Sequence, residues 1–305
     1  MNPLALDCPA PAKLNLFLHV TGRRPDGYHD LQSVFQLIDL ADSLDFSVRD
    51  DAEVRQLDPL HGVPPDHDLT VRAARRLQNE ARRRGLPVRG VDLRLVKRIP
   101  IGGGLGGGSS DAATTLIVLN RLWKIGLTRA ELMAIGLELG ADVPFFVFGA
   151  NAWAEGVDEQ LREIALPDRC FAVIYPGVQV PTATIFGAPE LTRNTKPIKI
   201  SDFSATLKHA GTLYGHNDLE PVAARHFPPV ARALQWLARH GAARMSGSGA
   251  CVFGVLPDAA AAHQVLTGLP AGWKGWVCRS RAQHPLRDWV NDGPGATAMS
   301  VAAPA

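Results

Sequence analysis

The sequence predicts an α+β protein made of two packed domains. Its 305 residues exceed the usual size of one hydrophobic core, since domains commonly contain about 100 to 200 residues. The first third alternates apolar and polar side chains with the period of two that is typical of strands, and later segments show the period of helices. Two such domains would leave room for a substrate cleft between them.

The first expected strand lies around residues 13–19. Leucines at every second position alternate with polar residues, so Lys13 and Asn15 share the face opposite to the leucines. An Arg-Pro-Asp-Gly turn at residues 24–27 precedes a second strand at residues 33–38, because Pro fixes one torsion and Gly allows a positive one. We expect the two strands to pair.

An arginine-rich helix and another strand follow. The arginines between residues 72 and 84 are interleaved with apolar residues at helical spacing, which favours a solvated helix face over an RNA-binding face. Residues 91–96 then alternate as a strand. The other expected elements are helices at residues 112–123 and 129–139, the second ending at Gly140, a strand at 171–174, and helices at 230–239 and 259–266.

A change in composition near residues 150–156 marks the expected domain boundary. The N-terminal domain would span residues 1–154 and the C-terminal domain residues 155–284. Residues 285–305 contain mainly Gly, Ala, Pro and Ser with little periodicity, so we predict a disordered tail there.

Composition excludes several classes of protein. A net charge of +2, from 32 basic and 30 acidic residues, implies no general attraction to nucleic acid or membrane. No apolar stretch approaches the roughly 18 residues of a membrane helix, and the first residues lack the pattern of a signal peptide. The four cysteines, Cys8, Cys170, Cys251 and Cys278, form no CxxC motif and indicate reduced thiols in a cytoplasmic protein. The histidines show no metal-binding spacing, so no protein-bound metal is expected.

The segment from Pro100 to Asp111 is the most informative part of the chain. Six of its residues between 102 and 108 are glycines, and the segment lies between an expected strand and an expected helix. Backbone amides without side chains can approach a ligand closely, and the start of the helix adds unpaired donors and a positive dipole end. The segment therefore predicts an anion site suited to polyphosphate.

Other glycine-rich motifs fit this segment less well. A P-loop requires Lys directly after its last glycine, and Ser109 stands there instead. A dinucleotide fingerprint requires an acid about twenty residues later at the end of a second strand, but residues 125–131 lie between two helices. A flexible linker would seldom separate a periodic strand from a periodic helix. Ser109 could also act simply as a helix N-cap.

Three motifs together resemble the superfamily of galactose, homoserine, mevalonate and phosphomevalonate (GHMP) kinases. They are Pro-Ala-Lys-Leu-Asn-Leu-Phe-Leu at residues 11–18, the glycine-rich segment, and Met-Ser-Gly-Ser-Gly-Ala-Cys-Val-Phe at residues 245–253. The resemblance implies the two-domain GHMP kinase fold, with ATP bound in a cleft between the domains. The ATP-binding residues that it implies are Pro100, Ile101, Gly102, Gly103, Gly104, Leu105, Gly106, Gly107, Gly108, Ser109 and Ser110.

A narrower resemblance, to the members that phosphorylate a cytidyl-linked methylerythritol, covers about residues 8–283. It rests on residues 21–35, on Gly-Ala-Asp-Val-Pro-Phe-Phe at residues 140–146, and on Tyr-Pro-Gly at residues 175–177. It implies transfer from ATP with Mg²⁺ to the 2-hydroxyl of the methylerythritol unit, in non-mevalonate isoprenoid synthesis. It leaves a homodimer open.

The same resemblance implies the catalytic pair. Asp142 would accept the proton of the substrate hydroxyl, and Lys13 would keep that carboxylate ionised and stabilise the transferring phosphoryl group. Such sparse machinery suits phosphoryl transfer, in which positioning and electrostatics do most of the work. The alternatives are that Asp142 only caps a helix before Pro144, and that Lys13 is an exposed strand lysine.

Four further residues are implied to bind the substrate: Asn15, beside Lys13, together with Tyr28, His29 and Phe186. Tyr28 and Phe186 would stack on the two faces of the cytosine, and His29 would hydrogen-bond to it. Base stacking contributes about 1 to 3 kcal/mol per base in single-strand binders. Ordinary core packing is the alternative for each ring.

One position departs from the family pattern, and two other functions compete. Asp68 stands where the family usually has Asn, and a carboxylate cannot donate as an amide does, so a purine contact there is in doubt. A homoserine or mevalonate type of kinase would keep the glycine-rich segment but lack the Gly-Tyr-His sequence at residues 27–29. A non-catalytic nucleotide-binding regulator would lack Lys13 or Asp142, and both residues are present.

Overall fold

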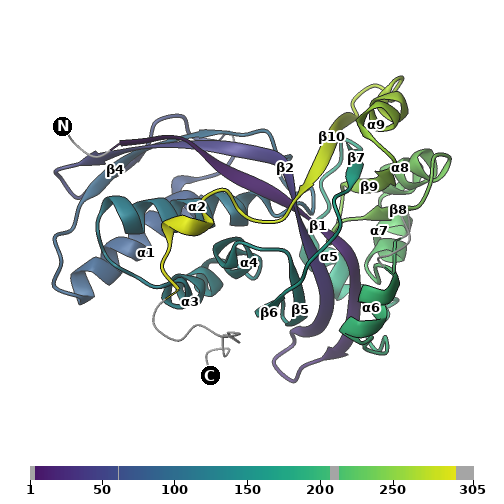
Figure 1. Ribbon diagram of the computed structural model, residues 1–305, viewed down its shortest axis with the longest axis horizontal. Helices are drawn as coiled ribbons and strands as arrows, with labels where there is room; N and C mark the ends of the chain where they lie inside the picture. Colours follow the sequence, from purple (N-terminus) through teal and green to yellow (C-terminus); the bar gives the residue numbers. More distant parts are fainter. Residues whose placement is uncertain (1–3, 61, 207–212, 293–305) are drawn as a thin grey trace.

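A computed structural model describes residues 4–60, 62–206 and 213–292 (Figure 1). The strands are β1 (Leu4–Arg23), β2 (His29–Arg49), β3 (Val54–Gln56), β4 (Gly90–Val96), β5 (Ala152–Gly156), β6 (Gln160–Glu163), β7 (Cys170–Tyr175), β8 (Ala243–Met245), β9 (Val252–Leu256) and β10 (Lys274–Arg281). The helices are α1 (Leu69–Arg83), α2 (Gly107–Leu122), α3 (Arg129–Leu139), α4 (Val143–Phe148), α5 (Thr182–Gly187), α6 (Ile200–Thr206), α7 (Glu220–His226), α8 (Pro228–Ala238) and α9 (Ala259–Leu266), with 3-10 turns η1 (Pro65–His67) and η2 (Arg287–Trp289).

Two long antiparallel strands form the centre of the molecule. β1 and β2 contain 20 and 21 residues, and their register pairs Lys13 with Leu37 and Asn15 with Phe35. The predicted turn joins them, and Gly27 there has a φ of 90°, a value that glycine adopts readily. The predicted pairing of the first two strands is therefore confirmed, although both strands are much longer than their apolar runs suggested.

β2 connects the two halves of the sheet. Its C-terminal part pairs with β4, its N-terminal part with β5, and residues Leu37 and Ile38 with β10. Beyond β10 the order continues through β7 and β9 to β8. The described strands thus form a single ten-stranded sheet that runs through both parts of the molecule.

Helices cover each part of the sheet separately. α1, α2, α3 and α4 pack below the N-terminal part, while α7, α8 and α9 lie beside β7 to β10 (Figure 1). α2 is buried along most of its length, which suits its position between β1 and α1. The α+β class is confirmed, and the helices predicted at residues 112–123, 129–139, 230–239 and 259–266 correspond to α2, α3, α8 and α9.

The end of the described chain does not match the predicted tail. Leu286 and Val290 are buried in the N-terminal core, and the Arg121 guanidinium lies 4.6 Å from the centre of the Trp289 ring. Residues 285–292 thus do not form the predicted disordered tail, because Leu286 and Val290 anchor them in the core. Residues 293–305 lie outside the described part of the chain.

The predicted domain boundary lies inside a strand of the sheet. The division between residues 154 and 155 falls inside β5, whose Ala152 to Gly156 pair with β2 on one side and, up to Glu155, with β6 on the other. The β5–β6 hairpin therefore extends the N-terminal part of the sheet. A composition shift did not reveal this, because strand pairing depends on residues more than 100 positions earlier in the chain.

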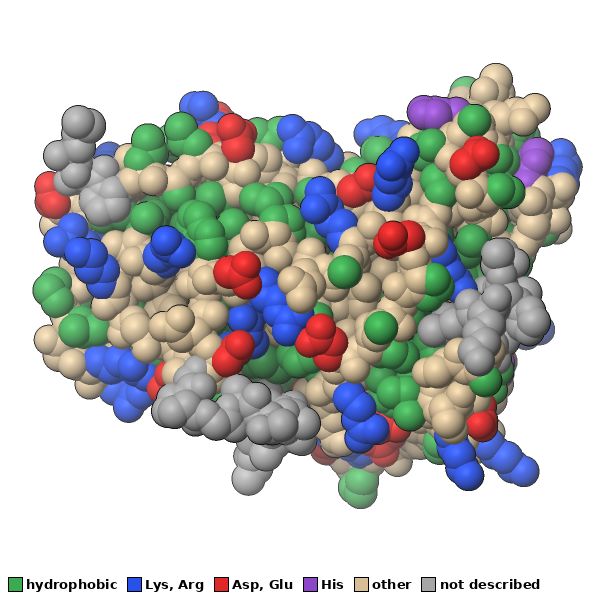
Figure 2. Space-filling view, in the orientation of Figure 1, with side chains coloured by type: hydrophobic (Ala, Val, Ile, Leu, Met, Phe, Trp, Pro, Cys, Tyr) green, Lys and Arg blue, Asp and Glu red, His purple; other side chains and the backbone are tan. Residues whose placement is uncertain are grey.

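The surface mixes charges of both signs. Lys and Arg side chains alternate with Asp and Glu over the face drawn in Figure 2, as the net charge of +2 predicts. None of the helices in the described ranges has both the length and the apolar character needed to cross a membrane. All four cysteines are free thiols, and Cys8, Cys251 and Cys278 are buried.

Candidate active site

A continuous cleft of about 1290 Å³ contains most of the predicted site residues. Its wall includes Lys13 and Asn15 from β1, the glycine-rich segment before α2, and Asp142 before α4. The far end is lined by Tyr28, His29 and Phe186. A drug-sized ligand usually occupies about 300 to 1,000 Å³, so this cleft is large enough for two substrates side by side.

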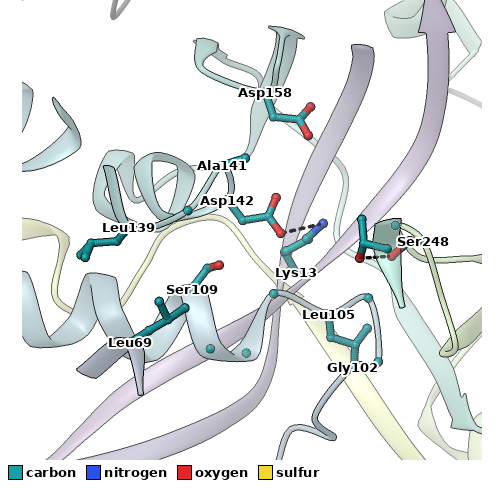
Figure 3. Close-up of a pocket in the computed structure, with 18 of the residues that line it drawn as sticks. Lys13, Leu69, Gly102, Leu105, Ser109, Leu139, Ala141, Asp142, Asp158 and Ser248 are labelled. Carbon is teal, nitrogen blue, oxygen red and sulfur yellow. Dashed lines mark hydrogen bonds and ion pairs between the residues drawn. The ribbon is translucent and has the colours of Figure 1, made fainter. Parts of the chain in front are cut away.

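Lys13, Asn15 and Asp142 form a polar group at the middle of the cleft. The Lys13 Nζ donates to the Asn15 Oδ1 at 2.5 Å and lies 3.4 Å from the Asp142 Oδ2 (Figure 3). Lys13 and Asn15 are buried, whereas the Asp142 side chain is 27% exposed. The ammonium therefore has fixed partners, and the carboxylate keeps access to a ligand.

The Asn15 side chain is oriented by the sheet. Its Nδ2 donates to the Ser33 Oγ at 2.9 Å, and this hydroxyl donates to the Phe17 carbonyl at 2.6 Å. Since the Asn15 amide nitrogen faces Ser33, its oxygen faces Lys13. The predicted sharing of one strand face thus becomes a direct contact, and neither side chain is an exposed strand-edge residue.

Asp142 occupies the N-cap position of α4, but its side chain makes no capping hydrogen bond. Pro144 lies in the first turn of this helix, where a missing amide hydrogen costs nothing. The carboxylate instead points toward Lys13 (Figure 3). The simple capping role is therefore wrong for this side chain.

The glycine-rich segment leads directly into α2. The helix begins at Gly107, with Gly106 at its N-cap and no side-chain cap. The amides of the first turn have no intrahelical partner, so these donors and the positive helix end face the cleft. Ser109 also lines the cleft but lies inside the helix, so the N-cap role considered for it is wrong.

Ser110 is placed differently from the other predicted residues of this segment. It does not line the cleft, and its hydroxyl is buried with no hydrogen-bond partner in the described structure. Its amide donates to the Gly106 carbonyl at 2.8 Å. The Ser110 side chain therefore lies behind the wall of the cleft, whereas the neighbouring Ser109 lines it.

Contacts with two distant segments hold the loop. The Lys13 amide donates to the Leu105 carbonyl at 3.0 Å, and the Ser246 hydroxyl donates to the Gly104 carbonyl at 2.9 Å. A Cβ at Gly104 would lie 2.1 Å from the Ser246 carbonyl oxygen, and φ there is 73°. Glycine is thus required at this position on both grounds. The motif at residues 245–253 acts here as the support of the loop.

A second lysine, which the sequence analysis missed, lies under the loop. The Lys97 Nζ contacts the Asp42 Oδ2 at 2.5 Å and the Asp111 Oδ2 at 2.6 Å. Burial opposes its charge, but the two carboxylates outweigh this effect and raise the pKa of Lys97. Burial also raises the pKa of Asp111. Only the position of Lys97 just before the loop could have drawn attention to it.

Asp158 is a further carboxyl group at the cleft that the sequence did not reveal. It lies in the turn between β5 and β6 with a φ of 74°, and its Oδ1 is buried with no partner among the described residues. Burial, together with the charge of Asp142 and against that of Lys13, raises the pKa of Asp158 to about 7. Asp158 and Asp142 are seen together in Figure 3.

The far end of the cleft contains the predicted aromatic residues. The His29 and Phe186 rings lie 5.1 Å apart between centroids at an interplanar angle of 31°. Tyr28 is 66% exposed on the turn before β2, so it is not packed in the core. Burial first, and then the charge of Arg193, lowers the pKa of His29.

Asp68 acts as the N-cap of α1. Its Oδ1 accepts from the Thr70 amide at 2.8 Å and from the Thr70 hydroxyl at 2.6 Å, and its Oδ2 accepts from the Gln56 Nε2 at 2.9 Å. Both carboxylate oxygens are thus occupied at the edge of the cleft. The departure from the family residue is accommodated locally.

The oxygen groups of the cleft suit a magnesium ion that arrives with a nucleotide. They are the carboxylates of Asp142 and Asp158 and the hydroxyl of Ser109. Mg²⁺ in nucleotide sites commonly binds one or two carboxylates together with phosphate oxygens and water. In the described ranges no three His, Cys, Asp or Glu residues are grouped to hold a metal by themselves.

Two family models match the chain. Residues 68–150 match the GHMP kinases N terminal domain, and residues 200–275 match the GHMP kinases C terminal model. The first contains α1, the glycine-rich segment and Asp142, and the second contains the motif that supports the loop.

Curated relatives are similar over nearly the whole chain. A 4-diphosphocytidyl-2-C-methyl-D-erythritol kinase of Herminiimonas arsenicoxydans is 59% identical over 280 residues, which cover 92% of this chain and 96% of the relative. The protein with the same name from Thiobacillus denitrificans is 57% identical, covering 92% and 98% of the two chains.

Solved structures give the same picture at the level of the fold. A crystal structure of 4-(cytidine 5'-diphospho)-2C-methyl-D-erythritol kinase is 35% identical, with a TM-score of 0.76 and coverage of 91% of this chain and 99% of the other. A homoserine kinase from Cytophaga hutchinsonii is 16% identical with a TM-score of 0.65, covering 93% and 96%, which shows a shared fold alone.

Proposed function

This chain belongs to the GHMP kinases, and we propose that it transfers the terminal phosphoryl group of ATP to the 2-hydroxyl of 4-diphosphocytidyl-2-C-methyl-D-erythritol. That reaction lies in non-mevalonate isoprenoid synthesis. Support comes from relatives at 54% to 59% identity that bear the name of this kinase. The four free thiols suit a cytoplasmic enzyme.

One observation carries the proposal from the structure itself. The Lys13–Asp142 pair lies in one cleft with a phosphate-type loop and a group of rings. A bisubstrate kinase needs this arrangement, because the acceptor hydroxyl must meet the terminal phosphate at the catalytic carboxylate. A nucleotide-binding regulator would need no such pair.

The glycine-rich loop binds the phosphates of ATP in this proposal. Amides at the start of α2 donate to phosphate oxygens, and the positive helix end favours their charge. Ser109 adds a hydroxyl donor. Mg²⁺ bound with ATP would supply charge neutralisation, with the carboxylates of Asp142 and Asp158 available as ligands.

Asp142 accepts the proton of the attacking hydroxyl, and Lys13 stabilises charge on the transferring group. The carboxylate keeps one side toward the cleft, so it can reach a hydroxyl there. The Lys13 ammonium is fixed by Asn15 and lies 4.8 Å from the centre of the Phe35 ring, which limits its movement. A fixed charge of this kind needs little reorganisation during the reaction.

The rings at the far end recognise the cytosine. Phe186 and His29 already pack together, and the exposed Tyr28 is free to lie over a bound base. Stacking of about 1 to 3 kcal/mol per base favours a nucleotide-bearing substrate over a bare polyol. The size of the cleft agrees with two nucleotide-containing ligands.

An ADP-release assay tests the proposal. Purified protein with Mg²⁺ and ATP is given the cytidyl-linked substrate, mevalonate or homoserine in separate reactions. We expect turnover with the first substrate and background rates with the other two. Equal rates with all three substrates, or a preference for homoserine or mevalonate, would refute the assignment.

A further inference from the structure

Arg193 is a half-buried residue that connects His29 with the backbone of Phe186. Its side chain donates to three backbone carbonyls, those of Leu191, Phe186 and Ala188, at 3.0, 2.9 and 2.7 Å. Its Nε donates to the His29 Nε2 at 3.1 Å. The guanidinium is thus immobilised by its surroundings and directed at one nitrogen of the histidine.

This contact determines the tautomer of His29. A guanidinium can only donate and stays charged, so the His29 Nε2 must accept and carry no proton. A neutral imidazole with an unprotonated Nε2 carries its proton on Nδ1. Burial first, and then the positive charge of Arg193, oppose a second proton and lower the pKa of His29.

The His29 Nδ1 is left for a ligand. Within the described ranges the hydrogen bonds of the His29 ring involve only Nε2, and the residue lines the cleft. Packing against Phe186 at 5.1 Å sets the plane of the ring. His29 therefore presents a donor, and not an acceptor, in a fixed orientation next to an aromatic surface.

We propose that Arg193 is a specificity-determining positioning residue, which holds His29 as an Nδ1–H donor and thereby selects a pyrimidine with an unprotonated ring nitrogen. This inference rests on the proposed function, in that a base occupies this end of the cleft. Cytosine has an acceptor at N3, whereas uracil has an N–H there. A fixed donor pairs with the first and leaves two opposed donors with the second.

A purely structural role for Arg193 makes a different prediction. Arg193 also holds the carbonyls of Phe186 and Ala188, so its loss could loosen the ring wall. A loosened ring wall would weaken the binding of cytosine and uracil nucleotides alike. If His29 instead became able to adopt either tautomer, cytosine binding would weaken and uracil binding would improve. The Nδ1 could then accept a hydrogen bond from uracil.

Calorimetric binding of CDP and UDP separates these outcomes. For the unmodified protein we expect CDP to bind at least about fivefold more tightly than UDP, the size of one lost hydrogen bond. In Arg193→Met the ratio should fall toward one, with UDP binding held or improved. Arg225→Met, an exposed arginine on α7, is the matched control and should keep the original ratio.

Two further measurements keep the test decisive if Arg193→Met is less stable. Long-range proton–nitrogen NMR spectra, with the His29 signals assigned by their loss in His29→Ala, should show a proton on Nδ1 and should show both tautomers in Arg193→Met. In a His29→Ala background, adding Arg193→Met should leave the CDP/UDP ratio unchanged.

The possible failures are distinguishable. If the unmodified protein prefers CDP and Arg193→Met keeps that preference, the inference is overturned and the proposed function stands. An equal loss of affinity for CDP and UDP in Arg193→Met would likewise overturn the inference. So would a proton found on the His29 Nε2 of the unmodified protein. If the unmodified protein binds neither nucleotide, the proposed function itself fails.

Discussion

Two lysine–carboxylate groups lie on either side of the glycine-rich loop, and they differ in what they leave open. Lys97 contacts Asp42 and Asp111 at 2.5 and 2.6 Å, and both carboxylate side chains are at most 3% exposed. Lys13 contacts Asp142 at 3.4 Å, and that carboxylate is 27% exposed. We call the first group closed because its carboxylates are buried, although Lys97 and Asp111 also line the cleft, and the second group open.

The difference indicates how a scaffold and a reactive centre are made from the same side chains. In the closed group, Asp42 also accepts from the amides of Arg98 and Ile99 at 2.5 and 2.8 Å, so it fixes the backbone that leads into the loop. In the open group, Asp142 has spare acceptor capacity facing the cleft. The exposure of the carboxylate, and not the residue type, therefore distinguishes a group that can react with a ligand from one that supports the backbone.

The largest effect is expected for the open group. Asp142→Asn removes the proton acceptor, so kcat should fall about 100- to 10,000-fold, while the melting temperature changes little because the side chain is no helix cap. Steady-state ADP release and thermal unfolding measure the two quantities. Lys13→Met should add little to this loss in the double variant, since the pair acts as one unit. Near-normal turnover of Asp142→Asn would remove this residue from the mechanism.

Substitutions in the closed group should lower the stability of the fold. Lys97→Met leaves two buried carboxyl groups without their shared counter-ion, which should lower the free energy of unfolding by about 3 to 5 kcal/mol in urea titrations. Adding Asp111→Asn should recover part of this loss by removing one of the charges. Lys196→Met, at an exposed position, is the control. A loss in Lys97→Met no larger than in the control would contradict the closed-group description.

Asp158 is buried like the carboxylates of the closed group but lines the cleft like Asp142. Its titration should make the stability of the protein depend on pH. Its pKa of about 7 when folded exceeds the value of 3.8 expected for an exposed Asp, so the unfolded chain loses this proton first as pH rises. Stability therefore falls between about pH 4 and pH 7, and the loss is complete above pH 7. Asp158→Asn should stabilise the protein by up to about 4 kcal/mol at pH 8 and by less at pH 5. A gain independent of pH would argue against this titration.

The smallest effect is expected at Asp68, a carboxylate that is closed but replaceable. Asp68→Asn keeps an N-cap oxygen for Thr70, and Asn and Asp cap helices about equally well. The Gln56 Oε1 is buried without a partner, so rotation of that amide supplies an acceptor for the new NH₂ group. The free energy of unfolding, measured in urea, should change by less than about 1 kcal/mol. A larger loss would show that Gln56 cannot rotate.

Local features of the fold could be predicted from the sequence because they depend on local patterns. The periodicity of residues 112–123 gives α2, and the Pro-Asp-Gly turn gives the connection between β1 and β2. The shared strand face of Lys13 and Asn15 follows from the period of two, and it leads to a direct hydrogen bond. Patterns of this kind need no knowledge of distant residues.

Other features could not be predicted because their partners are far apart in the chain. Arg193 and His29 are separated by 164 positions, and Lys97 and Asp42 by 55. Neither pair has a sequence signature, since residues so far apart in the chain meet only after it folds. Asp158 was missed for a related reason: its burial results from the β5–β6 hairpin and not from its neighbours in sequence.

The return of the chain to its starting half has a consequence for biosynthesis. Leu286 and Val290 complete the core around α2, and the Arg129 side chain donates to the carbonyls of Arg287 and Val290 at 2.9 and 3.2 Å. A nascent chain has made the glycine-rich loop long before these residues leave the ribosome. Part of the apolar surface of the N-terminal half therefore stays uncovered until residues 286–290 have been translated. Arrested chains ending at residue 283 should be more sensitive to protease in α2 and α3 than chains ending at residue 292.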